Sequence, residues 1–360
     1  MVKAKRPILL IGGLPGNSAE EAMRACAAEV GDLAIGLTDG ETNERRFWVL
    51  FVAIRAWEPH PDLELVRRPK GIPGMPHYIP TGYNDFYKFR VRSGVDKIEV
   101  PTLTYPIEAK SSYLVFRNLR DRGVIPRDTR FQVCIPFPED AARLFAHSAR
   151  DMEIMANGYA DAAARDVESI LHDIPANDLV LQWDINWETL AVAFDDYAGE
   201  EPMEYKANGD PMERYLRFVR QLCGPVPKEV VLGLHLCYGD LHHRHFLEPK
   251  TLATCVRLAN AAASEAGRRI DFVHMPIPRA RDDDEYFGPL KDLKIGDSTL
   301  YAGLVHYTDG VEGSRRRLER LRKHYAGVVG VATECGMGRR PPDQSFGELL
   351  RIHREVVEAI

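Results

Sequence analysis

The feature that most constrains the fold is a regular alternation of strand-like and helix-like segments along nearly all 360 residues. Eight short apolar runs are each followed by a stretch with helical periodicity or helix-capping residues. The expected strands are residues 7–11, 33–37, 131–135, 179–184, 230–237, 270–274, 300–306 and 327–333. Parallel strands joined by right-handed crossovers close most simply into a (β/α)8, or TIM, barrel.

The intervening helices support the same α/β architecture. Ser18 and Glu21 have the spacing of a capping box, which predicts a helix from Ser18 to about Val30. The other expected helices cover about 43–57, 107–123, 139–172, 212–223, 251–266, 314–324 and 346–359, with a short one after Asp283. An open doubly wound sheet is the alternative, but Gly12–Gly16 lacks the Gly-x-Gly-x-x-Gly spacing typical of that fold. One barrel domain over residues 1–360 therefore suffices.

One segment, residues 59–106, interrupts the alternation after the second strand. It is rich in proline, glycine and aromatic residues, and Lys88–Arg92 alternates with the period of two that an exposed hairpin strand shows. Because it follows the end of a strand, we expect it on the catalytic face of the barrel, as a lid or as the contact of a homodimer.

Composition excludes several classes of partner. The net charge of −6 argues against a nucleic-acid-binding surface, and no apolar run is long enough to cross a bilayer. The basic start, Met1–Arg6, leads directly into the first strand and lacks the features of a signal peptide. The six cysteines are too few and too scattered for a secreted disulfide framework. We therefore expect a cytoplasmic protein with reduced thiols.

Candidate metal ligands stand at the ends of three predicted strands. His235 and Cys237 end the fifth strand, His274 ends the sixth, and Cys335 follows the eighth. His235 and Cys237 are two residues apart, so their side chains should lie on the same side of the strand. The strand C-termini of a barrel meet at one mouth, and imidazole and thiolate ligands there favour zinc. The alternative is that these are simply buried core residues.

Other polar residues are expected at the same mouth. Gln182 and Asp184 share one side of the fourth strand, and His306 ends the seventh, where it could act as a general acid or base. The candidates for binding substrate are Asp39, Glu41, Arg46, Gln182 and Tyr238. Salt bridges and helix caps are the alternative for the first three, which follow the second strand.

Four motifs resemble cobalamin-independent methionine synthase. Gly233–Tyr238 is similar to that family's zinc-binding His-x-Cys strand, and Val331–Arg340 resembles its closing Cys-Gly motif, which supplies a further zinc ligand. Leu181–Ile185 is similar to the strand whose aspartate, here Asp184, holds the amino group of the thiol substrate. Ile11–Gly16 is similar to the opening of the catalytic barrel. The resemblance implies a one-barrel member of the methionine synthase and uroporphyrinogen decarboxylase superfamily.

One departure bears on the substrate. The family has a glutamate ligand within a Glu-Thr-Ser-Arg run at the end of the sixth strand, where this chain has His274–Arg279. His274 could replace the glutamate as a ligand, or it could be a core or substrate-contacting residue. The expected function is a zinc-dependent methyl or alkyl transferase that activates a thiol other than homocysteine. A methylated folate is one possible donor. The alternative is a metal-free lyase of the uroporphyrinogen decarboxylase type, acting on an acidic small molecule.

Overall fold

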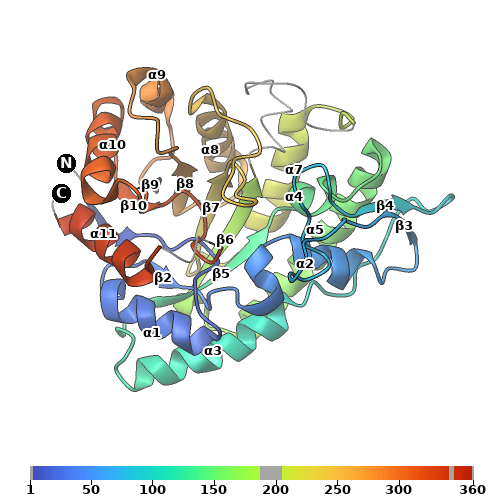
Figure 1. The fold of residues 1–360 in the computed structure, drawn as a ribbon, viewed down its shortest axis with the longest axis horizontal. Helices are drawn as coiled ribbons and strands as arrows, with labels where there is room; N and C mark the ends of the chain where they lie inside the picture. Colours follow the sequence, from blue (N-terminus) through green and yellow to red (C-terminus); the bar gives the residue numbers. More distant parts are fainter. Residues whose placement is uncertain (1–2, 187–204, 340–343, 359–360) are drawn as a thin grey trace.

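The structure, a computed structural model, describes residues 3–186, 205–339 and 344–358. Within these ranges, eight parallel strands form one sheet in the order β1-β10-β9-β8-β7-β6-β5-β2 (Figure 1). The strands are β1 (Lys3–Ile8), β2 (Gly36–Leu37), β5 (Arg130–Pro136), β6 (Leu179–Asn186), β7 (Val231–Cys237), β8 (Phe272–Pro276), β9 (Thr299–Val305) and β10 (Val329–Thr333). The predicted α/β class and parallel strand count are confirmed.

The two ends of the sheet meet beside β1. Ile8 forms a parallel bridge with Ala34, just before β2. The Ile8 amide donates to the Leu33 carbonyl at 3.2 Å, and the Ile35 amide donates to the Ile8 carbonyl at 3.0 Å. The curled sheet is thereby joined into the predicted barrel.

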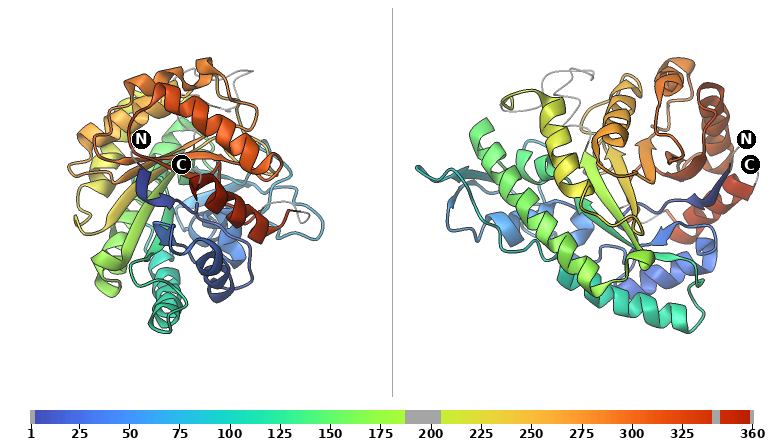
Figure 2. Two further views of the ribbon diagram at one scale, coloured as in Figure 1. Left: turned by 90° about the vertical axis from the view of Figure 1, so that its left-hand side faces the viewer. Right: turned by 180° about the vertical axis from the view of Figure 1, so that it is seen from behind.

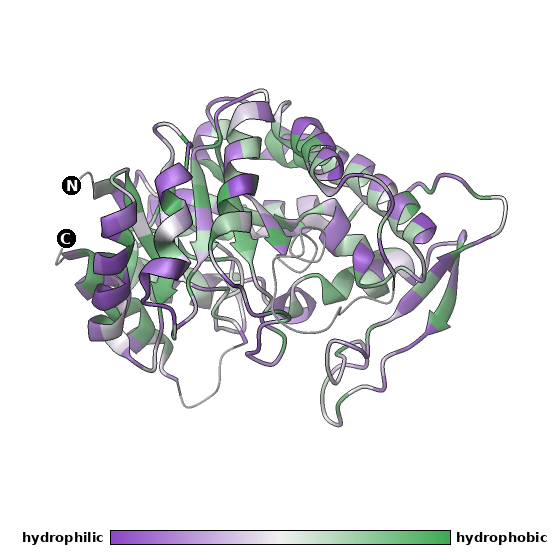
Figure 3. Cartoon of the chain, turned by 90° about the horizontal axis from the view of Figure 1, so that it is seen from above, coloured by the Kyte–Doolittle hydropathy of each residue, from purple (hydrophilic) through white to green (hydrophobic). Residues whose placement is uncertain are grey.

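Helices surround the sheet, with their polar residues on the outside and their apolar residues facing the strands (Figures 2 and 3). The longer ones are α1 (Ala19–Val30), α3 (Tyr105–Asp121), α5 (Ala149–Asp173), α7 (Pro211–Cys223), α8 (Ala253–Glu265), α10 (Gly310–His324) and α11 (Phe346–Glu358). The shorter ones are α2 (Leu50–Val52), α4 (Pro138–Arg143) and α9 (Asp284–Phe287). Within the described part of the chain, no helix is long and apolar enough to span a membrane.

The α1 helix begins as predicted. The Ser18 hydroxyl accepts a hydrogen bond from the Glu21 amide at 3.2 Å, and the Glu21 carboxylate accepts one from the Asn17 amide at 2.9 Å. At the other end of the chain, the last helix is described to Glu358, so its expected final residue, Ala359, lies outside the described residues.

Two predicted helices differ from the structure. The segment 139–172 divides into α4 and α5, because Ser148 starts a new helix by accepting a hydrogen bond from the Asp151 amide at 3.2 Å. The segment 43–57 is a 3-10 turn, the short α2 and a π-helical turn, η2 (Ala53–Trp57). Trp48 lies between the 3-10 turn and α2. Its positive φ of 52° is one that a continuous helix does not allow.

The first two strands are also placed differently. The first strand was predicted at residues 7–11, but β1 begins at Lys3 and ends at Ile8. Leu9 and Ile11 lie beyond its end, with their side chains in the barrel interior. That interior is filled by a small apolar cluster: Leu9, Ile11, Val180, Phe272, Tyr301 and Ala332. β2 is reduced to two residues because Ala34 pairs only as an isolated bridge. A larger core lies between the sheet and the helices.

The inserted segment 59–106 contains an antiparallel pair, β3 (Leu63–Arg67) and β4 (Lys88–Val91), which projects from the barrel (Figure 3). Between these strands, Tyr83 touches the loop that follows β7. Its hydroxyl accepts from the Leu241 amide at 3.1 Å and donates to the Arg244 carbonyl at 2.9 Å. The ring centroids of Tyr83 and Phe246 are 4.5 Å apart. The insertion therefore contacts the mouth of the barrel.

Candidate metal centre and adjoining pocket

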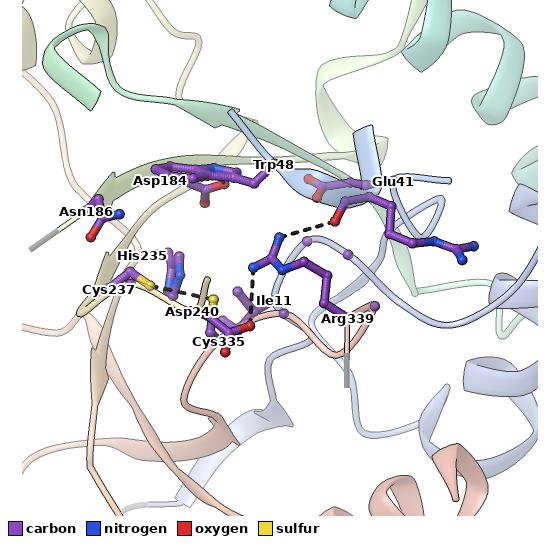
Figure 4. A pocket seen from close by; sticks show the side chains of 16 residues that line it. Ile11, Glu41, Trp48, Asp184, Asn186, His235, Cys237, Asp240, Cys335 and Arg339 are labelled. Atoms are coloured by element: carbon purple, nitrogen blue, oxygen red, sulfur yellow. Dashed lines mark hydrogen bonds and ion pairs between the residues drawn. The ribbon is translucent and has the colours of Figure 1, made fainter. Parts of the chain in front are cut away.

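Three potential metal ligands meet at the C-terminal mouth of the barrel. One ligand atom each from His235, Cys237 and Cys335 lies within 4.8 Å of the other two (Figure 4). The two sulfurs are 3.5 Å apart, although one belongs to β7 and the other follows β10. The parallel closure of the barrel is what brings these distant positions together.

The backbone around each ligand explains this placement. β7 is extended, so its period of two turns His235 and Cys237 to the same side. At the end of β10, the Thr333 hydroxyl donates to the Cys335 carbonyl at 2.7 Å. Gly336 then packs against the loop after β1, where a β-carbon would lie 3.0 Å from the Ile11 carbonyl oxygen. A glycine at 336 thus lets the Cys335 loop approach the barrel closely.

The protonation of these groups suits a cation. Burial, and then the adjacent His274, lower the pKa of His235 well below its ordinary value, so its ring is neutral. The contact with Cys335, together with burial, raises the pKa of the Cys237 thiol. Neutral imidazole is the form that binds metals. A thiol that is protonated in the absence of a metal releases its proton when its sulfur coordinates a cation.

His274 does not belong to this group of three. Its Nδ1 is 2.8 Å from Nδ1 of His235, and its Nε2 is 3.0 Å from the Thr333 carbonyl oxygen. Both ring nitrogens therefore face protein atoms. The predicted role of His274 as the fourth ligand is not supported by this arrangement, because its side chain lies against the back of His235.

Two of the three carboxylates that line a pocket in front of the three ligands have raised pKa values. Asp184 and Glu41 both line it, together with His235, Cys237 and Cys335 (Figure 4). Burial and the nearby Asp184 raise the pKa of Glu41 to about 8. Burial raises the pKa of Asp184 to about 7, even though Gln182 and Trp48 donate hydrogen bonds to it at 2.8 and 3.2 Å. Arg46 and Arg339 line the same pocket, but among the described residues neither Glu41 nor Asp184 forms an ion pair, so a cationic ligand group could pair with them.

Two further residues of the pocket were not among the predicted site residues. Arg339 donates to Asp240 at 3.2 Å and to the Arg46 carbonyl at 3.1 Å. Asn186 lies two residues beyond Asp184 on β6 and so shares its side; extending the predicted strand would have found it. Within the described ranges, the buried Asn186 Oδ1 has no hydrogen-bond partner. A polar ligand in the pocket could donate to it.

Two of the predicted substrate-binding residues after the second strand differ in their surroundings. Arg46 lines the pocket, as Glu41 does. Asp39 does not: its carboxylate accepts from Arg45 at 2.6 Å, from Ser112 at 2.8 Å and from the Glu41 amide at 2.9 Å. These bonds are those of a structural anchor for the loop that carries Glu41.

Three other predicted residues also lie outside the pocket lining. Gln182 is fully buried behind Asp184 and donates to it. The Tyr238 hydroxyl is 2.8 Å from that of Tyr286 in the apolar core. His306 donates from Nε2 to the Ile277 carbonyl at 2.9 Å, and burial lowers its pKa. Gln182 thus supports the pocket through its hydrogen bond to Asp184.

His306 instead lines a second cavity of about 660 Å³, whose wall also includes Cys335, Gly336, Glu334 and His245. Cys335 therefore lies between the two cavities. His245 contacts the half-buried Glu334 at 3.0 Å and Glu248 at 3.2 Å. Burial lowers the pKa of His245, but these two carboxylates outweigh it and raise the pKa to about 9. The His245–Glu334 ion pair thus joins the loops after β7 and β10.

The donor set matches zinc. One imidazole and two thiols are the ligand types of zinc sites, and three protein ligands leave a coordination position open for a substrate. The pocket in front of the three donors also has three carboxylates and the buried Asn186 Oδ1, which no other described residue binds, and these groups suit a polar ligand.

The fold is similar to that of two solved structures. It resembles the B12-independent methionine synthase of Shewanella sp. W3-18-1 in complex with selenomethionine, with a TM-score of 0.64, 12% identity and coverage of 99% and 98% of the two chains. It also resembles a putative B12-independent methionine synthase from Listeria monocytogenes, with a TM-score of 0.57, 12% identity and coverage of 100% and 99%. No family model matches the chain. No curated protein matches it in sequence. At this identity the likeness is one of fold.

Proposed function

We propose that the protein is a zinc-dependent methyl or alkyl transferase with a thiol acceptor. The observation that carries the proposal is the meeting of His235, Cys237 and Cys335 at the mouth of a methionine-synthase-like barrel. Zinc bound by these residues would hold an incoming thiol as a thiolate, which is the form that attacks an electrophilic carbon. The sulfur–carbon bond then forms as the bond between that carbon and its leaving group breaks.

The pocket supports an acceptor that also carries an amino group. An ammonium group between Glu41 and Asp184 would supply the cation that these carboxylates lack. Asn186 would accept a further hydrogen bond, and Arg339 would face an anionic group. These contacts orient the acceptor so that its sulfur points toward Cys237 and Cys335.

The donor would enter from the larger cavity. Its volume of about 660 Å³ is within the range of small-molecule sites, and Cys335 stands at its boundary with the acceptor pocket. A methylated folate remains one donor that the barrel's likeness suggests. The Tyr83 contacts would let the insertion 59–106 act as the lid that shields this reaction from water.

Metal analysis of the purified protein tests the proposal. We expect near-stoichiometric zinc in the wild type, and loss of it in Cys237→Ser and Cys335→Ser. Cys223→Ser is a matched control for Cys237→Ser, because Cys223 is also buried but lies in α7. Zinc retained by both ligand variants, or methyl transfer to a thiol by metal-free protein, would overturn the proposal.

The second candidate is a metal-free lyase acting on an acidic small molecule. It is favoured by the raised pKa values of Glu41 and Asp184, since such groups can donate a proton near neutral pH. Arg339 and Arg46 would hold the substrate's carboxylate. Full turnover in the metal-free cysteine variants, abolished by Asp184→Asn, would select this function.

A further inference from the structure

We infer that His274 is a positioning residue, which sets the tautomer of His235 and aligns the strands that carry the metal ligands. The role given to His274 rests on the proposed function, because positioning His235 matters only if His235 binds a metal. The contacts that support it belong to the protein alone.

The hydrogen-bond partners of His274 determine which nitrogen carries the proton. Its Nε2 faces the Thr333 carbonyl oxygen at 3.0 Å, and a carbonyl can only accept, so Nε2 must carry a hydrogen. A neutral imidazole has one such hydrogen, which leaves Nδ1 of His274 as an acceptor. The 2.8 Å contact with His235 then requires His235 to donate from its own Nδ1.

The opposite assignment fails. If His274 carried its hydrogen on Nδ1, its Nε2 and the Thr333 oxygen would be two acceptors 3.0 Å apart. The only gain would be a bond from Nδ1 to the Leu236 carbonyl, whose 3.3 Å separation exceeds the usual limit of about 3.2 Å. The favoured assignment leaves Nε2 of His235 with a free lone pair, which is what a metal ligand needs.

The side chain of His274 also spans the gap between the ligand strands. It starts on β8, where it is the register partner of His235, and reaches the Thr333 carbonyl on β10, two residues before Cys335. To do so it crosses β9 at Gly303, where a β-carbon would lie 2.6 Å from His274 Nε2. The glycine at position 303 therefore keeps the path of the ring open.

Nuclear magnetic resonance of the metal-free protein tests the tautomer directly. Long-range 15N–1H correlations should show His235 protonated on Nδ1 and His274 on Nε2. This measurement needs no metal, so it stands even if the protein binds no zinc and the proposed function fails. A His235 ring protonated on Nε2 in the wild type would overturn the inference.

Zinc affinity, measured by competition with a chelator, tests the consequence. We expect His274→Leu and Gly303→Ala to weaken zinc binding by about 10- to 100-fold, the usual effect of losing a ligand's hydrogen-bond partner. Gly303→Ala displaces the His274 ring without changing either histidine. This variant can therefore test the inference even if His274→Leu does not fold. His274→Gln keeps one acceptor and one donor, and should lose less than about tenfold.

A buried histidine elsewhere provides the matched control. His353 in α11 is as fully buried as His274 and donates from Nδ1 to the Leu349 carbonyl at 2.7 Å. His353→Leu should lower the melting temperature but leave zinc affinity unchanged. If His274→Leu and Gly303→Ala bind zinc within about threefold of the wild type, or if His353→Leu weakens zinc as much as they do, His274 is only a core residue.

Discussion

The sulfur of Cys237 lies 3.5 Å from the sulfur of Cys335, although 98 positions separate them in the chain. Without a metal between them, these thiols are close enough to be oxidised to a disulfide, whose sulfurs are about 2.05 Å apart. We expect a small-molecule disulfide to convert the metal-free protein into this cross-linked form, with the reagent reduced to two thiols. Mass spectrometry should find the loss of two hydrogen atoms and a Cys237–Cys335 peptide. Zinc-loaded protein that is oxidised equally fast would contradict a shared metal.

Asp184→Asn should weaken binding of an amino-containing thiol. The change removes a negative charge while keeping the side chain's shape, and a hydrogen bond to a charged group contributes about 1.5–3 kcal/mol. We expect KM for the acceptor to rise about 10- to 100-fold, with KM for the donor unchanged. Asp166→Asn is the control, since Asp166 is also buried but binds Thr102 and the Leu103 amide. An equal rise in both KM values would argue against an acceptor site at Asp184.

Stability should depend on pH through Glu41. The folded protein raises the pKa of Glu41 from 4.5 to about 8, so folding favours the protonated carboxyl. Its contribution is complete below pH 4.5 and is lost as the pH rises toward about 8. The unfolding free energy of metal-free wild type, minus that of Glu41→Gln, should fall over this window by at most about 1.4 kcal/mol per pH unit. The measurement is urea denaturation over this pH range. If the free-energy difference grew with pH, the pKa of Glu41 would be lowered in the folded protein, not raised.

Gly233→Ala should destabilise the barrel interior. Gly233 is the register partner of Phe272, and a β-carbon at 233 would overlap the fully buried Phe272 ring. Overpacking of this kind costs about 1–3 kcal/mol. We expect a lower melting temperature for Gly233→Ala, partly restored in the double variant with Phe272→Leu. A single variant as stable as the wild type would mean that the ring has room to move.

Sequence periodicity and strand ends predicted the barrel and the positions of the candidate ligands that meet at its mouth. His235 and Cys237 could be found because a period of two determines their side, and Cys335 because it follows a strand end. Asp184 could be found for the same reason. Such residues depend on local geometry and on the single rule that parallel strands end at one mouth.

The other residues depend on contacts that local pattern does not contain. Asp39 and Glu41 both follow β2, but only the fold shows that Arg45 and Ser112 bind Asp39 while Glu41 lines the pocket. His274 was expected at a strand end, as a ligand would be, but it lies in the middle of β8 and its ring faces His235 and Thr333. The break between α4 and α5 was also not predictable. Its capping residue, Ser148, stands within a sequence that has helical periodicity throughout, and a serine alone does not indicate where a helix ends.

The junction between β1 and β2 has a consequence for how the molecule opens. β6 and β7 are paired along seven residues, whereas the joint beside Ile8 is a single bridge with two backbone hydrogen bonds. Fluctuations that separate neighbouring strands should therefore start at this seam, and amide hydrogen exchange should be fastest there. Glu41 lies in the loop after β2, so this side of the pocket should open more readily than the strands that carry the candidate ligands. The barrel thereby combines a firmly paired half, which carries the candidate ligands, with a weakly paired half on the opposite side of the pocket.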